Sequence, residues 1–422
     1  MEEWLEQTLI KLNLVDTMEQ KEGFTRLGYT EEENESIQQF TDIANDLGLT
    51  VYTDSAGNVF ARWEGFHPTE EVVTLGSHLD TVIQGGGYDG QAGIVCALGA
   101  IKTLKEQGFT PKNSIEIIVF RSEESARFGI STIGSKSVSG ILDLKIGNVK
   151  DSNGTTLMEA VEHLGLKWSD FPKAKRGNIK SFLELHIEQG TIIEENNKQF
   201  GVVRGVACPI RLKVKITGKA SHTGTTPMHK RQDALLSASQ LIPFVYERAL
   251  HLSSGSEVPV VATASTMEVK PNAMNVIPSY VEVGIDIRSV SDELKQQIAL
   301  EITKKCEVIE ELTKCSIEVE TLVHNPSILL DETIQQKLVK IGDNLGYTSL
   351  IMDSGAGHDV MNMQNICPSG LIFIPCKEGL SHHPDEYASI QDLHLGVEII
   401  AEYLKLEAGD QVEDTSRGSR TK

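Results

Sequence analysis

The sequence predicts an α/β protein, in which a mixed β-sheet is flanked by helices and a smaller α+β domain is inserted into the larger one. In the outer parts of the chain, short apolar runs alternate with helical patterns, which is typical of a sheet buried between helices. Between about Ile210 and His324 the pattern changes to the period-two alternation of half-exposed antiparallel strands. At 422 residues the chain also exceeds the usual size of a single hydrophobic core, so two domains are expected.

The larger domain opens with two helical patterns and a hairpin. Helices are expected around 4–12 and 33–47, and Val51 and Val59 flank the turn DSAGN. Four short runs rich in β-branched or aromatic residues follow as candidates for buried strands. Each is followed within a short loop by His or Glu, which predicts one site at one edge of the sheet. The four runs are 72–75, 115–120, 182–185 and 371–374.

The inserted domain begins with RLKVKITG, in which Leu212, Val214 and Ile216 alternate with basic residues. The order of elements after it, β-α-β-β-α-β, is the split βαβ or ferredoxin-like arrangement. Its helices are expected near 233–250 and 291–312, and its remaining strands near 260–269, 280–287 and 316–323. We therefore expect a discontinuous larger domain over 1–209 and 325–408, an inserted domain over 210–324, and a disordered tail over 409–422.

Charge and cysteine usage narrow the class of protein. With 39 basic and 60 acidic side chains the formal charge is −21, which would repel nucleic acid and anionic lipid. The six cysteines are scattered without a C-x-x-C pair, as expected for reduced thiols in the cytoplasm. The start of the chain lacks a signal-peptide pattern, and no apolar run approaches membrane-spanning length.

The segment GSHLDTVIQGGGYDG carries the first candidates for metal ligands. His78 and Asp80 are two apart at a strand end, so one can bind a metal while the other orients its imidazole. Asp89 lies among glycines that let the backbone bend and bring a carboxylate beside His78. The alternatives are a core histidine and a turn aspartate. The segment also fits the dinucleotide pattern G-x-G-x-x-G, but a carboxylate inside that loop would repel a pyrophosphate.

Further candidates complete a set large enough for two ions that share one carboxylate. Glu123 and Glu124 follow a buried strand, and adjacent side chains diverge, so one can bind metal while the other takes a proton from water. A solvated acidic turn is the alternative. His186 and His382 supply imidazoles, although His383 competes with His382 and spacing does not separate them. Histidine and carboxylate sites accept zinc, manganese, cobalt or nickel.

Substrate-binding candidates lie in the inserted domain. Arg288 offers a bidentate grip on a carboxylate, and His222 and Asn275 can donate to a developing oxyanion. GAGHD, residues 355–359, has the composition of an amide nest for an anion. Each also fits a turn or surface role. The sequence has no G-x-S-x-G elbow or papain-type cysteine signature, so a covalent nucleophile is unsupported.

Taken together, the motifs resemble the M20 metallopeptidase-like amidohydrolases. The resembling branch contains N-carbamoyl-L-amino-acid hydrolases, allantoate amidohydrolases and β-ureidopropionases. The resemblance runs from the motif around Asp80 to Tyr387, and eight motifs occur in family order. They are GSHLDTV, GGxxDGxxG, RSEESARF, LELHIEQG, HTGTTPM, PNAMNVIP, SGAGHD and SHHPDE.

The resemblance implies a role for each candidate. One ion would be held by His78, Asp89 and His186, and the other by Asp89, Glu124 and His382, with Asp89 bridging. The family pattern places the last ligand directly after the serine, which selects His382 over His383. Glu123 would be the general base and Asp80 the acid that orients the imidazole. The family also implies a homodimer through the inserted domain, and substrate roles for Gln189, His222, Asn275, Arg288 and His358.

The sequence departs from the family pattern on the substrate side. Carbamoyl hydrolases commonly show Asn-His-Ala where this chain has Ser221, His222 and Thr223, and Cys208 and Pro209 replace small, glycine-rich sequence. We expect hydrolysis of a ureido or carbamoyl C–N bond in a small carboxylate substrate, an N-carbamoyl-L-amino acid or allantoate, with release of ammonia and carbon dioxide. The alternatives are an M20 peptidase or N-acyl-amino-acid deacylase and, more remotely, a noncatalytic binding protein of the same fold.

Overall fold

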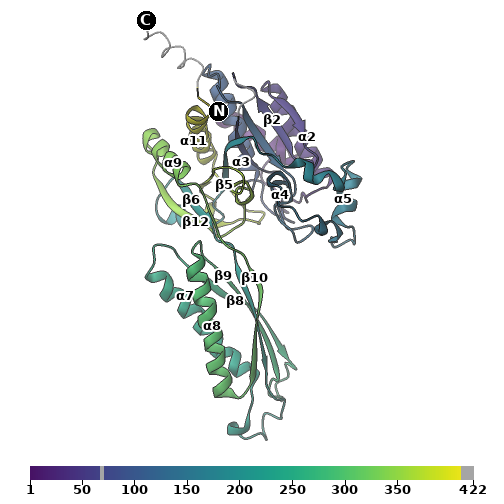
Figure 1. Cartoon of the computed structure of the whole chain (residues 1–422), viewed down its shortest axis with the longest axis vertical. Helices are drawn as coiled ribbons and strands as arrows, with labels where there is room; N and C mark the ends of the chain where they lie inside the picture. The colour runs from purple at the N-terminus through teal and green to yellow at the C-terminus, as the bar shows by residue number, and fades with distance from the viewer. Residues whose placement is uncertain (67–70, 410–422) are drawn as a thin grey trace. The chain divides into compact units, whose positions relative to one another are not determined.

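The computed structural model describes residues 1–66 and 71–409, and the chain divides into two compact units (Figure 1). The first unit contains Met1–Arg204, Leu330–Met352 and the chain from His358 onward. The second contains Gly205–Leu329 and Asp353–Gly357. The expected disordered tail, apart from Gly409, lies outside the described residues.

The first unit is built on a mixed sheet, which confirms the predicted fold class. Within the described residues the strand order is β1-β2-β4-β3-β5-β13-β6-β11, and β12 also pairs with β6. The central strands β4, β3, β5 and β13 run parallel, whereas β1, β2 and β6 pair antiparallel with their neighbours. The strands are β1 (Thr50–Thr53), β2 (Val59–Trp63), β3 (Val72–His78), β4 (Ile115–Phe120), β5 (Ile179–Ile187), β6 (Phe200–Val206), β12 (Ser349–Ser354) and β13 (Ser369–Ile374). β11 (Ile328–Leu329) pairs with Gly205 and Val206 at the end of β6, and these residues fall in the range of the second unit.

The register of the parallel strands brings their carboxyl ends to one edge. His78, the last residue of β3, pairs with Phe120, the last residue of β4. On the other side, His186 near the end of β5 pairs with Phe373 of β13. All residues of β3, β4 and β13 are buried, as expected for strands covered on both faces. Side chains that follow these strands therefore meet at one place.

Helices cover both faces of this sheet. Leu183 and Leu185 of β5 belong to the same buried core as α3 and α11. Glu184 points the other way, because successive side chains of a strand alternate, and it accepts the backbone N–H of Val360 at the start of α10. The helices of the first unit are α1 (Glu2–Asn13), α2 (Glu31–Asp46), α3 (Gln91–Glu106), α4 (Ile133–Ser139), α5 (Leu157–His163), α6 (Ile192–Glu195), α9 (Glu332–Leu345), α10 (Val360–Met363) and α11 (Ile390–Ala408).

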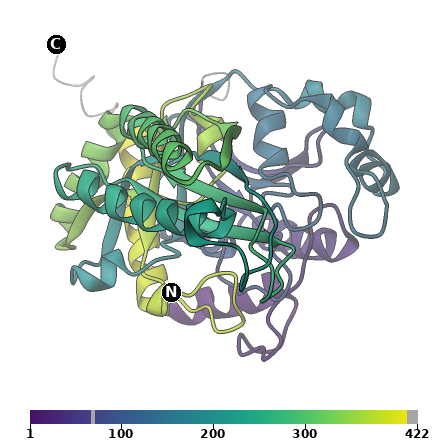
Figure 2. The ribbon, with the colours of Figure 1, turned by 90° about the horizontal axis from the view of Figure 1, so that it is seen from below.

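The second unit is an antiparallel sheet with two helices packed on one face. Its strand order is β10-β7-β9-β8, and the chain order β-α-β-β-α-β is the split βαβ arrangement expected from the sequence. Figures 1 and 2 show α7 and α8 lying side by side. Both begin at side-chain caps, Asp233 and Ser291. The elements are β7 (Ile210–Thr217), α7 (Ala234–Ser254), β8 (Val261–Lys270), β9 (Tyr280–Arg288), α8 (Asp292–Thr313) and β10 (Ser316–His324).

The alternation of apolar and charged residues along β7 explains why one face of this sheet is exposed to solvent. Leu212, Val214 and Ile216 are buried in the core beneath the helices. On the opposite face Lys213 pairs with Glu282 at 3.1 Å, and similar pairs cross neighbouring strands.

No helix within the described part of the chain has the length and apolar composition that are needed to span a membrane.

Candidate metal centre

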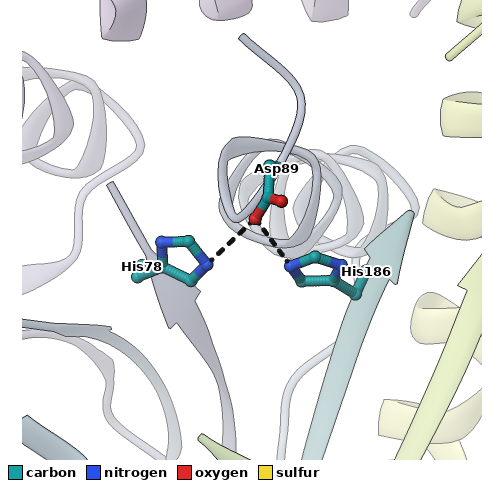
Figure 3. Close-up of side chains that lie close together, drawn as sticks. All are labelled: His78, Asp89 and His186. Carbon is teal, nitrogen blue, oxygen red and sulfur yellow. Dashed lines mark ion pairs between the residues drawn. The ribbon is translucent and has the colours of Figure 1, made fainter. Parts of the chain in front are cut away.

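Five of the predicted ligands lie in two groups that share a carboxylate. The first ligand group is His78, Asp89 and His186, and the second ligand group is Asp89, Glu124 and His382. In each group the potential ligand atoms all lie within 4.8 Å of one another. Figure 3 shows the first ligand group, with both imidazoles directed at Asp89.

The backbone fixes which nitrogen of each imidazole faces Asp89. Nδ1 of His78 lies 3.0 Å from the carbonyl oxygen of Asp80, and Nδ1 of His186 lies 2.9 Å from that of Ile187. A carbonyl oxygen only accepts hydrogen bonds, so each Nδ1 carries the proton. The Nε2 atoms of His78 and His186 then lie 3.3 and 3.1 Å from Oδ1 of Asp89.

This donor set fits a divalent metal ion. In the neutral imidazoles, the Nε2 lone pairs converge on a carboxylate oxygen, and these electron-rich atoms repel one another unless a proton or a cation lies among them. Burial alone would lower the pKa of His78, but Asp80 and Asp89 outweigh it and raise the pKa well above its usual value. A proton and a metal ion therefore compete for the same atoms. Imidazole nitrogen with carboxylate oxygen suits zinc, manganese, cobalt or nickel.

The glycine loop before α3 allows the close approach of Asp89. Gly90 has φ +76°, in the left-handed region, and a Cβ there would lie 2.5 Å from Cε1 of the His78 ring. Burial on its own would raise the pKa of Asp89, but His186, His382 and His78 outweigh it and hold that pKa well below its usual value. Asp89 is thus an ionised bridge between the two groups.

The second ligand group is completed by His382 rather than His383. Nε2 of His382 lies 3.2 Å from Oε1 of Glu124 and 3.3 Å from Oδ2 of Asp89. These two carboxylates raise the pKa of His382 to about 10. His383 instead turns to Asp385, whose backbone N–H it accepts at 3.1 Å. The His382 side chain is 48% exposed, so this group opens toward solvent.

Asp80 organises the segment that carries the paired glutamates. Its buried carboxylate accepts the backbone N–H of Glu123 at 3.0 Å and of Glu124 at 2.9 Å. The same carboxylate lies 3.5 Å from Nδ1 of His78, whereas the shorter contact of that nitrogen is to the Asp80 carbonyl. Asp80 therefore touches both the imidazole and the glutamate segment, and its role as the orienting acid stays a prediction.

Glu123 lies beside the first ligand group without belonging to it. Its Oε2 is 3.9 Å from Nε2 of His78. Burial, with the nearby Glu124, Asp359 and Asp80, raises the pKa of Glu123 well above its usual value, and His78 only partly opposes this. A carboxylate with a raised pKa holds a proton more firmly, which suits a group that takes a proton from water and later returns it.

Sequence reasoning missed two carboxylates that support this centre. Glu33 of α2 accepts the backbone N–H of Ser122 at 3.1 Å and pairs with Arg121 at 2.8 Å. Ser122 has φ +51°, so the segment before Glu123 turns in a strained conformation that needs such support. Glu386 contacts the two segments that carry Asp89 and His382. The only sequence signal for Glu386 was its place in the motif SHHPDE.

The predicted substrate residues fall in both units. In the first unit, Gln189 donates to Oδ2 of Asp89 at 2.7 Å, and buried His358 packs edge-on against His186 with ring centroids 4.5 Å apart. In the second unit, the segments of His222 and Asn275 lie side by side, because Thr223 N–H donates to the Asn275 carbonyl at 3.2 Å.

Arg288, the last predicted substrate residue, is held within the second unit. Its Nε donates to Asp286 at 2.7 Å and its Nη1 to the carbonyl of Gly355 at 2.5 Å. None of the residues predicted to bind substrate belongs to either ligand group. Their substrate roles therefore stay predictions.

Comparison with known proteins gives a consistent result. The model of the peptidase family M20/M25/M40 matches residues 74–406. The chain is 35% identical over 380 residues to an N-carbamoyl-L-amino acid amidohydrolase of Geobacillus stearothermophilus, covering 90% of this chain and 92% of that protein. It is 35% identical over 386 residues to a ureidoglycolate hydrolase of Arabidopsis thaliana, covering 89% and 80%.

An allantoate amidohydrolase and the solved structure of an amidase are also similar to this chain. An allantoate amidohydrolase of Escherichia coli is 32% identical over 380 residues, covering 90% of this chain and 92% of that protein. The crystal structure of an amidase of the hydantoinase/carbamoylase family from Burkholderia multivorans matches with a TM-score of 0.89 and 28% identity, covering 97% of this chain and 98% of that one.

Proposed function

The chain belongs to the peptidase family M20/M25/M40, and we propose that it is a metal-dependent amidohydrolase cleaving a ureido or carbamoyl C–N bond. The proposed substrate is a small carboxylate, either an N-carbamoyl-L-amino acid or allantoate, and the products include ammonia and carbon dioxide. The observation that carries the proposal is the pair of ligand groups that share Asp89, with Glu123 beside them. The substrates named for the relatives supply the bond type.

The residues of the chain have separate tasks in the proposed reaction. Two divalent ions, bound by the first and second ligand groups, would supply Lewis acidity that acidifies water and polarises the substrate carbonyl. The Glu123 carboxylate takes a proton from the attacking water as the C–O bond forms at the ureido carbon. Glu123 then returns that proton to the leaving nitrogen as the C–N bond breaks. The raised pKa of Glu123 favours the stage of the reaction in which its carboxyl group holds the proton.

Three residues of the second unit have proposed roles in substrate binding. His222 and Asn275 are proposed as donors to the oxygen that gains charge in the tetrahedral stage, a role in which a well-placed donor contributes about 3 kcal/mol. Arg288 holds the substrate carboxylate, which explains how a chain of net charge −21 accepts an acidic substrate. Gln189 and His358 are proposed to line the substrate site next to the metal ligands.

We also propose a homodimer formed through the second unit. Tyr246 and Leu250 of α7 and Val261 and Met267 of β8 are exposed apolar side chains that a second copy of the chain could cover. Among the strands of the described residues, β8 pairs only with β9, so its other edge is available to pair with a second copy. Sedimentation at micromolar concentration tests the dimer, and a single monomeric species would contradict it.

All six cysteines are free, which supports the proposed cytoplasmic location.

The test of the proposed reaction is ammonia release by the manganese- or cobalt-loaded protein. The panel contains allantoate, ureidoglycolate and several N-carbamoyl-L-amino acids, with N-acetyl-amino acids and dipeptides as controls. Ammonia from one ureido class identifies the reaction and separates the leading substrates. Amine freed from a control compound without ammonia would instead assign a peptidase or deacylase activity to the same metal centre.

A further inference from the structure

We propose that Glu386 is a positioning residue whose carboxylate holds the segment of Asp89 against the segment of His382. This inference rests on the proposed two-ion site. Glu386 lies outside both ligand groups, so its effect would act through other residues. It contacts the segment that begins α3 and the segment that precedes α11, which are about 300 residues apart in the chain.

Each oxygen of the Glu386 carboxylate serves one of the two segments. Oε1 accepts the backbone N–H groups of Tyr88 at 3.0 Å and of Asp89 at 2.9 Å. Oε2 accepts the Ser381 hydroxyl at 3.0 Å and the backbone N–H of His382 at 3.2 Å. Two of the four donors are the backbone groups of metal-ligand candidates. The carboxylate thus sets the spacing between Asp89 and His382.

The surroundings of Glu386 make this arrangement rigid. The residue is only 4% exposed, so its hydrogen bonds meet little competition from water. Hydrogen bonds from backbone N–H groups to a carboxylate are stronger than those between neutral groups. A Cβ on Gly86 would lie 2.2 Å from the Glu386 carboxylate, so the glycine loop is wrapped closely around it. Glu386 is therefore part of the local frame and not a surface acid.

The backbone of the His382 segment needs such a partner. His382 has φ +56°, in the left-handed region that a non-glycine residue rarely adopts. A conformation of this kind persists where the surroundings hold it. Glu386 supplies one such hold, through the N–H of the strained residue itself. Without it, we expect the imidazole to sample positions away from Asp89 and Glu124.

The two ligand groups depend on Glu386 to different degrees. In the second ligand group, two of the three ligands, Asp89 and His382, are on segments that Glu386 holds. In the first ligand group only Asp89 is, because His78 and His186 stand on β3 and β5 with their own Nδ1 contacts. A loss of Glu386 should therefore weaken the second ion more than the first.

The experiment is calorimetric titration of the metal-stripped full-length protein with Mn²⁺, comparing the wild type with Glu386→Gln. Glutamine keeps the shape but presents an amide NH₂ to one pair of donors. We expect one ion to bind within about threefold of its wild-type affinity and the other about 10- to 100-fold more weakly, the usual cost of removing a residue that orients metal ligands. Thermal melting of the metal-free proteins measures the purely structural effect.

Asp151→Asn is the matched control. One oxygen of Asp151 accepts two backbone N–H groups, those of Asn153 and Thr155, both at 3.0 Å, and the other pairs with Arg127 at 3.2 Å, in a turn that carries no ligand; asparagine removes that ion pair. The Asp151→Asn variant should lower the melting temperature without weakening the affinity for one ion more than the affinity for the other. Should Glu386→Gln fail to fold, Glu386→Asp keeps the charge but shortens the side chain, so that its carboxylate reaches one of the two segments less well, and it is expected to weaken the same ion by a smaller factor.

The outcomes separate this inference from the proposed function. A wild type that binds two ions, with Glu386→Gln weakened selectively at one, supports both. The positioning role would be overturned if Glu386→Gln bound both ions with wild-type affinity. It would also be overturned if the variant lost equal affinity for both ions in proportion to its loss of thermal stability. Either result would leave the two-ion site supported. A wild type that binds fewer than two ions would overturn the two-ion site, and the inference with it.

Discussion

Replacing Asp80 by asparagine should uncouple the glutamate segment from the rest of the centre. The buried carboxylate of Asp80 accepts two backbone N–H groups, at 3.0 Å from Glu123 and 2.9 Å from Glu124. Asparagine has the same shape but only one oxygen acceptor, and its NH₂ group would face one of the two N–H groups. One backbone donor must then be left unpaired or the segment must move.

The magnitude follows from these two hydrogen bonds. An unpaired buried N–H costs about 1–3 kcal/mol, and the remaining bond, now to a neutral oxygen, weakens by about 1 kcal/mol. We therefore expect Asp80→Asn to be less stable by about 2–4 kcal/mol. If the segment moves instead, Glu123 is displaced from its place beside His78, and a misplacement of about 1 Å can lower the rate about 100-fold.

Urea unfolding and initial rates of ammonia release measure the two effects on one preparation. We expect Asp80→Asn to lose about 100-fold or more in kcat for each folded molecule. Asp151→Asn removes an ion pair with Arg127 at 3.2 Å and leaves one oxygen for the two backbone N–H groups that Asp151 accepts, so it should lose stability but keep its rate. An Asp80→Asn protein that turns over substrate within threefold of the wild type would show that Asp80 is not needed to place Glu123.

Three further outcomes are expected. His186→Ala and His382→Ala should each lower the bound manganese from two ions to one per chain by elemental analysis, because each belongs to one ligand group only; retention of two ions by both would contradict the assignment. Chelation should lower the melting temperature by several degrees, since ions bound only by the folded state stabilise it by about 4 kcal/mol at 1,000 times their Kd; an unchanged melting curve would exclude tight binding. Glu33→Gln breaks a buried pair with Arg121 and should cost about 3–5 kcal/mol in urea unfolding, and a loss below about 1 kcal/mol would show that the pair is dispensable.

The fold could be predicted because its main signals are local. The four apolar runs were found as β3, β4, β5 and β13, since a strand buried on both faces is nearly all apolar. The inserted unit was visible in the alternation along β7. β6 and β12 were missed, because FGVVRGV contains two glycines and SLIMDS is partly polar and only partly buried. Such strands form through pairing with neighbours, which a local pattern does not contain.

For the candidate site, too, residues with a local sequence signal could be predicted, and residues that act through distant contacts could not. Ligand candidates at the end of a strand or just after it, such as His78 and Glu124, could be proposed from position and residue type, and both belong to the two groups. Glu33 and Glu386 could not, because they act by accepting backbone N–H groups from segments far away in the chain. An acid with that task has no periodicity and no metal-like spacing. Only the folded chain shows which N–H groups an acidic side chain meets.

The proposed division of roles between the two glutamates is tested by Glu123→Gln, measured for bound manganese and for ammonia release on the same sample. Glu123 belongs to neither ligand group but lies beside the first, so we expect two bound ions and a rate lowered by at least about 1,000-fold. A near-normal rate would remove Glu123 from proton transfer. Loss of an ion would make it a ligand and contradict the division of roles between the two glutamates.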